Sequence, residues 1–129
     1  MKKYDFIEYW VKSSKHDMKV SESLFKDKHF DYCLFLAHLS LEKILKALWV
    51  KNNIENIPPK THNLVYLAQN SNINLDDDKL KFLQFINTFN ISSRYPDYKF
   101  KIHKMCNKEY TDKNLRKIKE FYKCLTKKL

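Results

Sequence analysis

The chain has 129 residues, contains no glycine and carries a formal net charge of +10. This length suffices for one sizeable core, and 43% hydrophobic residues argue against disorder, so we expect a single domain spanning residues 1–129. The absence of glycine excludes phosphate loops built from glycine backbone, so any nucleotide must be bound by side chains.

The positive charge is concentrated in the C-terminal quarter of the chain. Residues 98–129 hold eleven Lys and Arg against three acidic residues, whereas residues 1–97 are nearly neutral. Such a field attracts nucleic acid, anionic lipid or an acidic protein partner. Lysines number 23 against two arginines, so a biased composition with ordinary solvated lysines remains an alternative.

The cysteines indicate a reducing environment. Cys33, Cys106 and Cys124 are odd in number and contain no close pair, so we expect no disulfide framework. The chain opens without a signal peptide, and no stretch approaches the roughly 20 apolar residues of a membrane span. We therefore expect a soluble cytoplasmic protein that does not enter a membrane. His103 and Cys106 are too few for a zinc site, so we also expect neither a metal nor a cofactor.

Apolar residues recur at helical spacing through the first half of the chain. Residues 5–26 predict an amphipathic helix in which Ser14 and Ser21 share the apolar stripe and permit close approach of a neighbouring helix. Residues 30–51 are apolar almost all round, which predicts the central helix. Its few polar residues fall within one narrow sector at about 100° per residue, and they are Asp31, His38, Glu42 and Lys46.

Two prolines separate the central helix from the rest of the chain. Pro58 and Pro59 cannot continue a helix, so we expect an extended connection. Thr61 then suits the N-cap of a short third helix, which ends in the asparagine-rich run 70–74. A fourth helix is predicted over about 77–92.

Pro96 ends this region because it disfavours helical geometry in the residue before it. We expect residues 98–110 to form a basic loop, and Thr111 or Asp112 to cap a fifth helix that runs to the C-terminus. The sequence therefore predicts an all-α fold, an antiparallel up-and-down bundle of four to five helices.

Four short motifs, in this order and spacing, resemble those of the HEPN domain family. They are Tyr32, then His38 with Glu42-Lys43-Ile44-Leu45-Lys46-Ala47-Leu48, then Thr61-His62-Asn63-Leu64, then Arg94-Tyr95-Pro96-Asp97. Trp10 and Asp17 agree with the family's opening helix, so the resemblance covers nearly the whole chain. It implies a helical bundle, usually a homodimer, that is associated with nucleotide or RNA. It also implies a small nucleotidyltransferase as the frequent partner in a toxin–antitoxin pair.

The chain departs from the family pattern at two places. At the position of Asn63 the family usually has an acidic residue. The change from an acid to Asn63 affects any helix-capping or charge role of that position. HEPN ribonucleases resemble one another in an arginine that is followed, after four to six residues, by a histidine. Two such chains pair in a dimer to cleave RNA without metal. Here eight residues separate Arg94 from His103, although a loop after Pro96 could fold His103 back. His103 would then be the general acid or base, and Arg94 would stabilise the phosphorane charge.

Arg94 is the first candidate for ligand binding, because an arginine fork matches phosphate geometry. The alternative is a structural ion pair with Asp97 or Glu42. Tyr95 and Asp97 belong to the same predicted turn and are included among the ligand-binding candidates. Lys99, Lys101 and Lys104 interleave with aromatic residues, as in proteins that bind single-stranded RNA, although those rings could equally pack in the core.

The polar stripe supplies the other candidates. His38, Glu42 and Lys46 could line a cleft or a dimer seam, with Glu42 accepting from a ribose or base and Lys46 meeting a phosphate. The alternatives are a solvated helix face and a buried Glu–Lys network at an interface. Thr61 and His62 either contact the ligand or serve as a helix cap and a loop histidine.

These observations favour a dimeric HEPN binding module that meets a nucleotide, RNA or a small nucleotidyltransferase. The alternatives are a metal-independent endoribonuclease toxin that uses Arg94 and His103, and a non-catalytic helical adaptor with a basic docking end. The central hypothesis is geometric: Glu42 and Lys46 should lie beside the guanidinium of Arg94 in one shared pocket.

Overall fold

A computed structural model describes all 129 residues and contains helices but no strands. The all-α prediction is confirmed. Two short 3₁₀ turns, Asn87–Phe89 and Ile91–Ser93, join the fourth and fifth helices. The helices are α1 (Lys3–Lys26), α2 (Phe30–Asn52), α3 (Leu64–Gln69), α4 (Asp77–Ile86), α5 (Pro96–Met105) and α6 (Lys108–Thr126).

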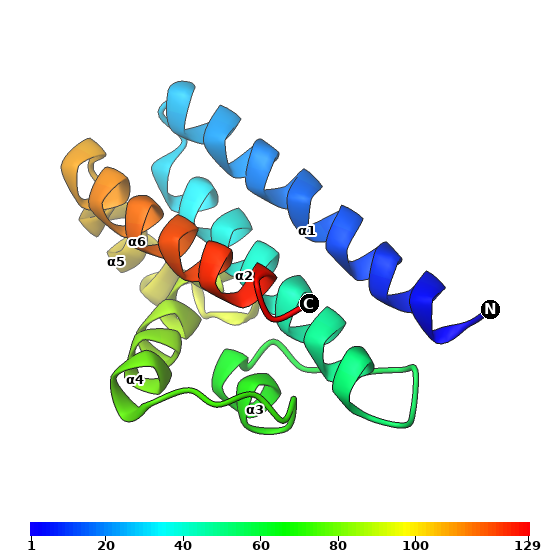
Figure 1. Ribbon diagram of the computed structural model, residues 1–129. Helices are drawn as coiled ribbons and strands as arrows, with labels where there is room; N and C mark the ends of the chain where they lie inside the picture. The colour runs from blue at the N-terminus through cyan, green and yellow to red at the C-terminus, as the bar shows by residue number, and fades with distance from the viewer.

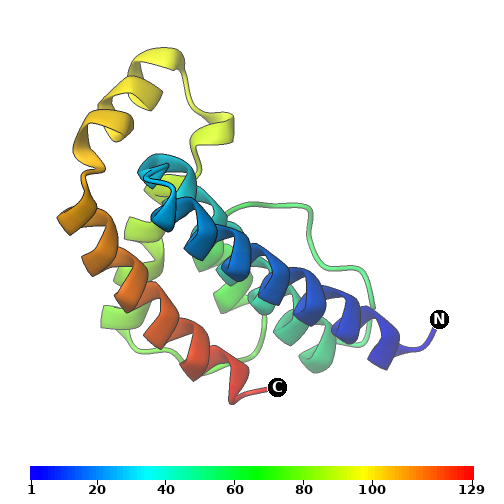
Figure 2. The same ribbon diagram turned by 90° about the horizontal axis from the view of Figure 1, so that it is seen from above.

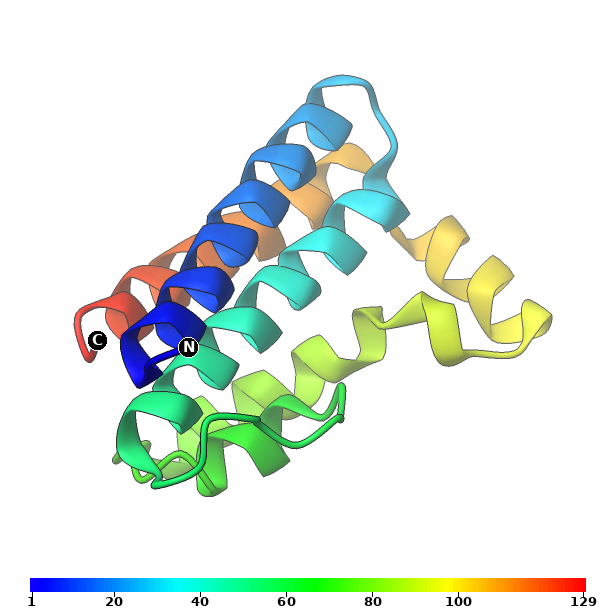
Figure 3. The same ribbon diagram turned by 90° about the vertical axis from the view of Figure 1, so that its right-hand side faces the viewer.

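Three long helices form the body of the bundle. In Figure 1, α2 and α6 run in one direction and α1 runs in the opposite direction beside them, while α3 and α4 lie on the other side of α2. Seen from above in Figure 2, α5 stands apart from the long helices, and Figure 3 shows it projecting from one end of the bundle. The helix α2 is therefore central, as the sequence predicts.

The helices α1 and α2 meet through small residues, as the serine stripe predicts. Ser14 and Ser21 are fully buried. The Ser14 hydroxyl donates to the carbonyl of Ser40 at 2.7 Å, and the Ser21 hydroxyl donates to the carbonyl of Cys33 at 2.7 Å. Each buried hydroxyl is thus satisfied by the backbone of the neighbouring helix.

The segment after Arg94 is a helix, so the predicted basic loop over residues 98–110 is wrong. Pro96 occupies the first turn of α5, where its missing N–H costs nothing and its fixed φ suits a helix. The prediction used Pro96 only as a terminator of the preceding helix. Ile102 is buried and attaches α5 to the core.

Two predicted helix starts also need correction. The N-cap of α3 is Asn63, whose side chain accepts from the amides of Val65 and Tyr66, and not Thr61. The cap of α6 is Asn107, whose side chain accepts from the Tyr110 amide at 2.8 Å, whereas Thr111 is buried inside the helix. Asparagine therefore takes the capping role that we assigned to threonine. None of the helices combines the length and the apolar character needed to cross a membrane.

Candidate functional site

Glu42 is the centre of a buried polar cluster on α2. Its side chain is 4% exposed, and its two carboxylate oxygens have different partners. One oxygen lies 3.0 Å from Nζ of Lys46, and the other lies 2.8 Å from Nδ1 of His62. The Glu42 carboxylate therefore ties the loop before α3 to the central helix. Of the alternatives for the stripe, a solvated helix face is wrong, because His38, Glu42 and Lys46 are buried within the single chain. A Glu–Lys network is present, and its place at an interface between two chains stays a prediction.

Lys46 and its neighbour Lys43 face the first helix. Nζ of Lys46 lies 5.2 Å from the ring centroid of Trp10, within the range of a cation–π contact. Nζ of Lys43 lies 2.7 Å from the carboxylate of Asp17. These pairs join α1 to α2, so the residues that carry the family resemblance in the two helices contact one another.

Arg94 lies in a small cavity of about 250 Å³ that no hydrophobic residue lines. The lining residues are His62, Asn63, Asn87, Asn90, Ser93 and Arg94. Glu42 reaches this cavity only through His62, and Lys46 does not line it. The hypothesis of one pocket shared by Glu42, Lys46 and Arg94 is therefore wrong, because neither Glu42 nor Lys46 lines the cavity of Arg94; His62, which lines it, connects Glu42 to it.

The guanidinium of Arg94 has no acidic partner. Its Nη2 donates to the carbonyl of Asn87 at 3.4 Å, and its Cζ lies 5.0 Å from the ring centroid of Tyr98. The predicted structural pair with Asp97 or Glu42 is wrong, because Asp97 accepts from the Tyr98 amide and Glu42 pairs with Lys46 and His62. An arginine that pairs with no carboxylate keeps its fork free for an anion.

The side chain of Asn87 connects the two walls of the cavity. Its Oδ1 accepts from the Leu64 amide at 2.9 Å, and its Nδ2 donates to Oδ1 of Asn63 at 3.0 Å. Asn63 thus caps α3 and binds Asn87 with the same oxygen. Sequence reasoning missed Asn87 and Asn90, because they fall in a segment that was predicted as an ordinary helix, and it missed Ser93, which directly follows that segment. The motif Thr61-His62-Asn63-Leu64 marks only Asn63 among the asparagines of the cavity.

His38 supports the cavity from inside the core. It is fully buried, and its Nε2 donates to the carbonyl of His62 at 3.2 Å. Its Nδ1 has no hydrogen-bond partner. Burial lowers the pKa of His38 to about 4, so the ring is neutral near neutral pH. His38 therefore holds the backbone of His62 in place from the buried side.

Three other predicted ligand-binding residues do not line the cavity. The Thr61 hydroxyl accepts from the Asn63 amide at 3.1 Å. Tyr95 is 82% exposed, and the Asp97 carboxylate accepts from the Tyr98 amide. The structure thus brings His62 and Arg94 together, with Glu42 behind His62.

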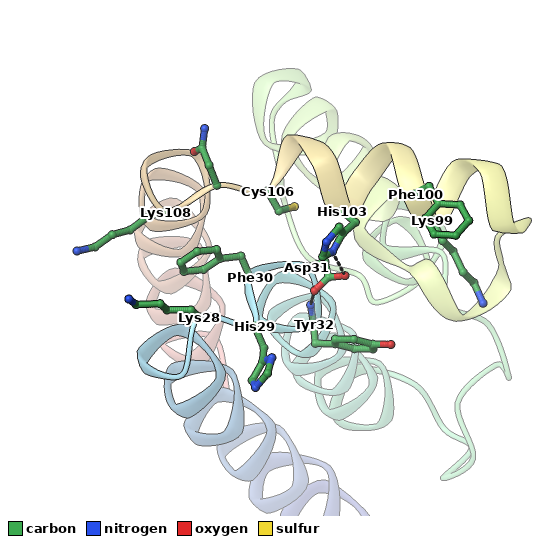
Figure 4. Close-up of a pocket in the computed structure, with 11 residues that line it drawn as sticks. Lys28, His29, Phe30, Asp31, Tyr32, Lys99, Phe100, His103, Cys106 and Lys108 are labelled. Carbon is green, nitrogen blue, oxygen red and sulfur yellow. Dashed lines mark hydrogen bonds and ion pairs between the residues drawn. The ribbon is translucent and has the colours of Figure 1, made fainter.

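His103 lies in a different cavity from Arg94. Its Nδ1 is 3.1 Å from the carboxylate of Asp31, at the start of α2 (Figure 4). Arg94 contacts Tyr98 in α5, and His103 follows Tyr98 by five residues, which is about 7.5 Å along a helix and about 140° around it. Because α5 is a helix and not a loop, it does not fold His103 back onto Arg94 within one chain.

The predicted basic surface is divided in the same way. Lys99 lines the cavity of His103, whereas Lys101 and Lys104 are exposed elsewhere on α5. No group of three or more His, Cys, Asp or Glu side chains is placed to hold a metal ion. The three cysteines are free, and burial raises the pKa of Cys106 to about 12.

The fold and the site together define an all-α bundle in which buried acid–base pairs on the central helix support a polar cavity. The chain belongs to the HEPN domain family, whose family model matches residues 7–129. The resemblance carried by the four sequence motifs is thereby confirmed.

A solved structure gives the same fold. The crystal structure of TT1696 from Thermus thermophilus is similar with a TM-score of 0.79 and 15% sequence identity, and the match covers 95% of this chain and 98% of that one. At this identity the similarity concerns the fold alone. A search of curated proteins found no match.

Proposed function

We propose that this chain, acting as a single HEPN unit over residues 1–129, binds a nucleotide in the cavity around Arg94 and His62. The observation that carries the proposal is an arginine without an acidic partner in a cavity lined only by polar and charged residues. A guanidinium meets phosphate oxygens through paired hydrogen bonds, and asparagine amides pair with the donor and acceptor edges of bases. A volume of about 250 Å³ suits one phosphoryl group or one base.

Glu42 acts as a positioning residue in this proposal. Its carboxylate accepts from Nδ1 of His62 at 2.8 Å, which leaves Nε2 of His62 to accept from a ligand hydroxyl. The Glu42 side chain is buried, so it holds the His62 ring in one orientation while the ring itself faces the solvent.

Binding of mononucleotides, measured by calorimetry, tests the proposal. We expect Arg94→Ala to weaken binding about tenfold or more, because a charge-assisted hydrogen bond contributes about 1.5–3 kcal/mol. Arg116→Ala is the matched control, since the only other arginine is exposed and pairs with Asp112 on the surface. Equal affinities for wild type and Arg94→Ala would contradict the proposal.

The family resemblance supports two finer proposals about partners. We propose a homodimer and a small nucleotidyltransferase as the partner in a toxin–antitoxin pair. Light scattering on the purified chain tests the dimer. Co-expression with a nucleotidyltransferase encoded beside this chain, followed by mass measurement of both proteins, tests the pair. A monomer that neither binds nor is modified by such an enzyme would contradict both.

The endoribonuclease and adaptor alternatives are tested with the same variants. Within one chain Arg94 and His103 line separate cavities, so RNA cleavage would require a second copy to bring them together. An enzyme would cleave RNA in EDTA and lose this activity in both Arg94→Ala and His103→Ala. An adaptor would bind an acidic protein and no nucleotide.

A further inference from the structure

A third cavity lies between the start of α1 and the loop that follows α2, which lie side by side in Figure 1. This α1 cavity has a volume of about 320 Å³. The function proposed above does not use it, because none of its residues lines the cavity of Arg94. Its lining includes Phe6, Tyr9 and Trp10 from α1 and Asn56, Ile57 and Pro58 from the loop.

No charged side chain lines the α1 cavity, although 31% of the residues of the chain are charged. Its walls are largely aromatic, and the ring centroids of Tyr9 and Trp10 lie 5.1 Å apart at an interplanar angle of 78°. The nearby ammonium of Lys46, which contacts the Trp10 ring, is already paired with Glu42. An ion in the cavity would lose its hydration without gaining a counter-charge. The α1 cavity therefore suits an uncharged, apolar molecule.

The walls of the α1 cavity are fixed in the chain itself. Nζ of Lys3 donates to the carbonyls of Val50 and Asn53 at 2.7 Å each and to the carbonyl of Glu55 at 3.3 Å, so the loop is fastened to the start of α1. Pro58 is buried, and its ring fixes the backbone φ angle at this wall. A cavity whose walls are already ordered reduces the entropy that binding costs.

One polar atom of a lining residue lacks a hydrogen-bond partner. Oδ1 of Asn56 is buried and accepts from no donor of the chain. A buried acceptor without a partner is unfavourable, and a donor on a bound molecule would remove this cost. An apolar lining with a single polar group that orients the ligand is typical of sites for small molecules.

These properties define the class of ligand. Aromatic walls favour a flat aromatic molecule, which packs against them edge to face or in an offset stack. The volume of about 320 Å³ is at the small end of ligand cavities, so one or two fused rings fill it. The oxygen of Asn56 requires an N–H or O–H donor on the molecule. A second copy of the chain would have to cover about 800 Å² of each partner, which is far more than these two short segments provide.

We propose that the α1 cavity is a binding site for a small, uncharged aromatic molecule with one hydrogen-bond donor, such as an indole or a phenol. The rings of Phe6, Tyr9 and Trp10 pack against the molecule, and Asn56 accepts from its donor. Arg94 takes no part, so this inference is independent of the nucleotide site.

Titration of the isotope-labelled chain with indole, followed by NMR, tests the site. The chain has two tryptophans, so the Nε1–H resonance of Trp10 reports on the cavity and that of Trp49 is the internal reference. We expect a saturable shift of the Trp10 resonance with a dissociation constant of about 1 mM or below. Benzofuran has nearly the same shape and no donor, so it should bind about tenfold more weakly.

Two variants test the roles of single residues. Asn56→Leu keeps a side chain of similar size without the acceptor, so it should bind indole and benzofuran equally. Ile57→Lys places a charge at the cavity and should weaken indole binding about tenfold. Ile54→Lys is the matched control, because Ile54 belongs to the same loop, is 96% exposed and does not line the cavity. This control should keep the wild-type affinity.

Four results would overturn the site: no saturable shift of the Trp10 resonance, an equal shift of the Trp49 resonance, equal affinities of the wild type for indole and benzofuran, or equal losses in the two lysine variants. A dimer that Ile57→Lys alone dissociates, without indole binding, would also overturn it and assign this face to a second copy. Arg94→Ala should leave the affinity for indole unchanged. A failure of the nucleotide site and a failure of the α1 cavity are therefore distinguishable.

Discussion

The charged residues around the two halves of α2 differ in burial and in ion pairing. In the second half, Glu42, Lys43 and Lys46 are largely buried, and each has a partner on α1, on α2 or in the loop before α3. Around the first turn of α2, three lysines of the neighbouring segments, Lys28, Lys99 and Lys108, are exposed to solvent and make no ion pair. Paired buried charges contribute to a unique packing of helices, whereas unpaired exposed charges contribute little to the fold and remain available to a ligand. Stability and binding should therefore respond to different residues.

The largest effect on stability should come from the carboxylate of Glu42. Glu42→Ala leaves Lys46 buried without its partner and releases His62, so we expect the free energy of unfolding to fall by about 3–5 kcal/mol. Glu8→Ala is the control, because Glu8 forms a surface pair with Lys12, and its loss should cost about 0.5 kcal/mol or less. Urea denaturation measures both. Similar losses in the two variants would remove the distinction between paired buried and exposed charges.

The second effect depends on pH and on His38. Its pKa of about 4 lies below the ordinary value of 6.5, so the unfolded chain takes up this proton first as the pH falls. The free energy of unfolding should therefore decrease between pH 6.5 and pH 4, by up to about 3 kcal/mol from this group. His38→Gln should flatten this part of the profile, whereas His16→Gln, at an exposed position of α1, should not. Parallel profiles for wild type and His38→Gln would contradict the assignment.

A smaller effect is expected at the junction of α5 and α6. Asn107→Ala removes the oxygen that accepts from the Tyr110 amide, and it should cost about 1 kcal/mol. Asp112→Asn, at a position where the sequence suggested a cap, removes only a surface pair with Arg116 and should cost a few tenths of a kcal/mol. Thermal unfolding of the two variants ranks them. A larger loss for Asp112→Asn than for Asn107→Ala would support the cap near Asp112 that the sequence predicted.

The smallest effect on stability should come from Lys28, Lys99 and Lys108, the unpaired lysines around the first turn of α2. The triple variant Lys28→Gln, Lys99→Gln, Lys108→Gln should change the free energy of unfolding by about 0.5 kcal/mol or less, because these side chains have no partners to lose. Urea denaturation of this variant beside Glu42→Ala makes this comparison. A loss above about 1 kcal/mol would place these lysines in the structural network and weaken the contrast between the two halves of α2.

The sequence predicted the parts of the fold that depend on local periodicity. The helices α1 and α2, the buried serines between them and the polar stripe of Glu42 all follow from spacing along one helix. Pro96 was misinterpreted because a proline both excludes a helix before it and favours one after it. The helix α5 carries little apolar periodicity of its own, so the surrounding charges dominated its appearance in the sequence.

The candidate site was predictable only where a motif marked it. His62 and Arg94 belong to the family motifs, and they do meet in one cavity. Asn87 and Asn90 complete that cavity, and the hydrogen bonds that join Asn87 to Asn63 and Leu64 at the start of α3 span more than twenty residues, which no local pattern encodes. In a chain with eleven asparagines, no property of the sequence distinguishes these two from the others.

The serine contacts between α1 and α2 have a consequence for how this chain tolerates mutation. In the absence of glycine, two hydroxymethyl groups set how far apart the axes of the two helices lie. Ser14→Ala or Ser21→Ala would keep that gap and lose only the hydrogen bonds of the hydroxyl. A valine or leucine at either position would act as a wedge, and because helices move as rigid rods, the displacement would spread along the whole seam between them.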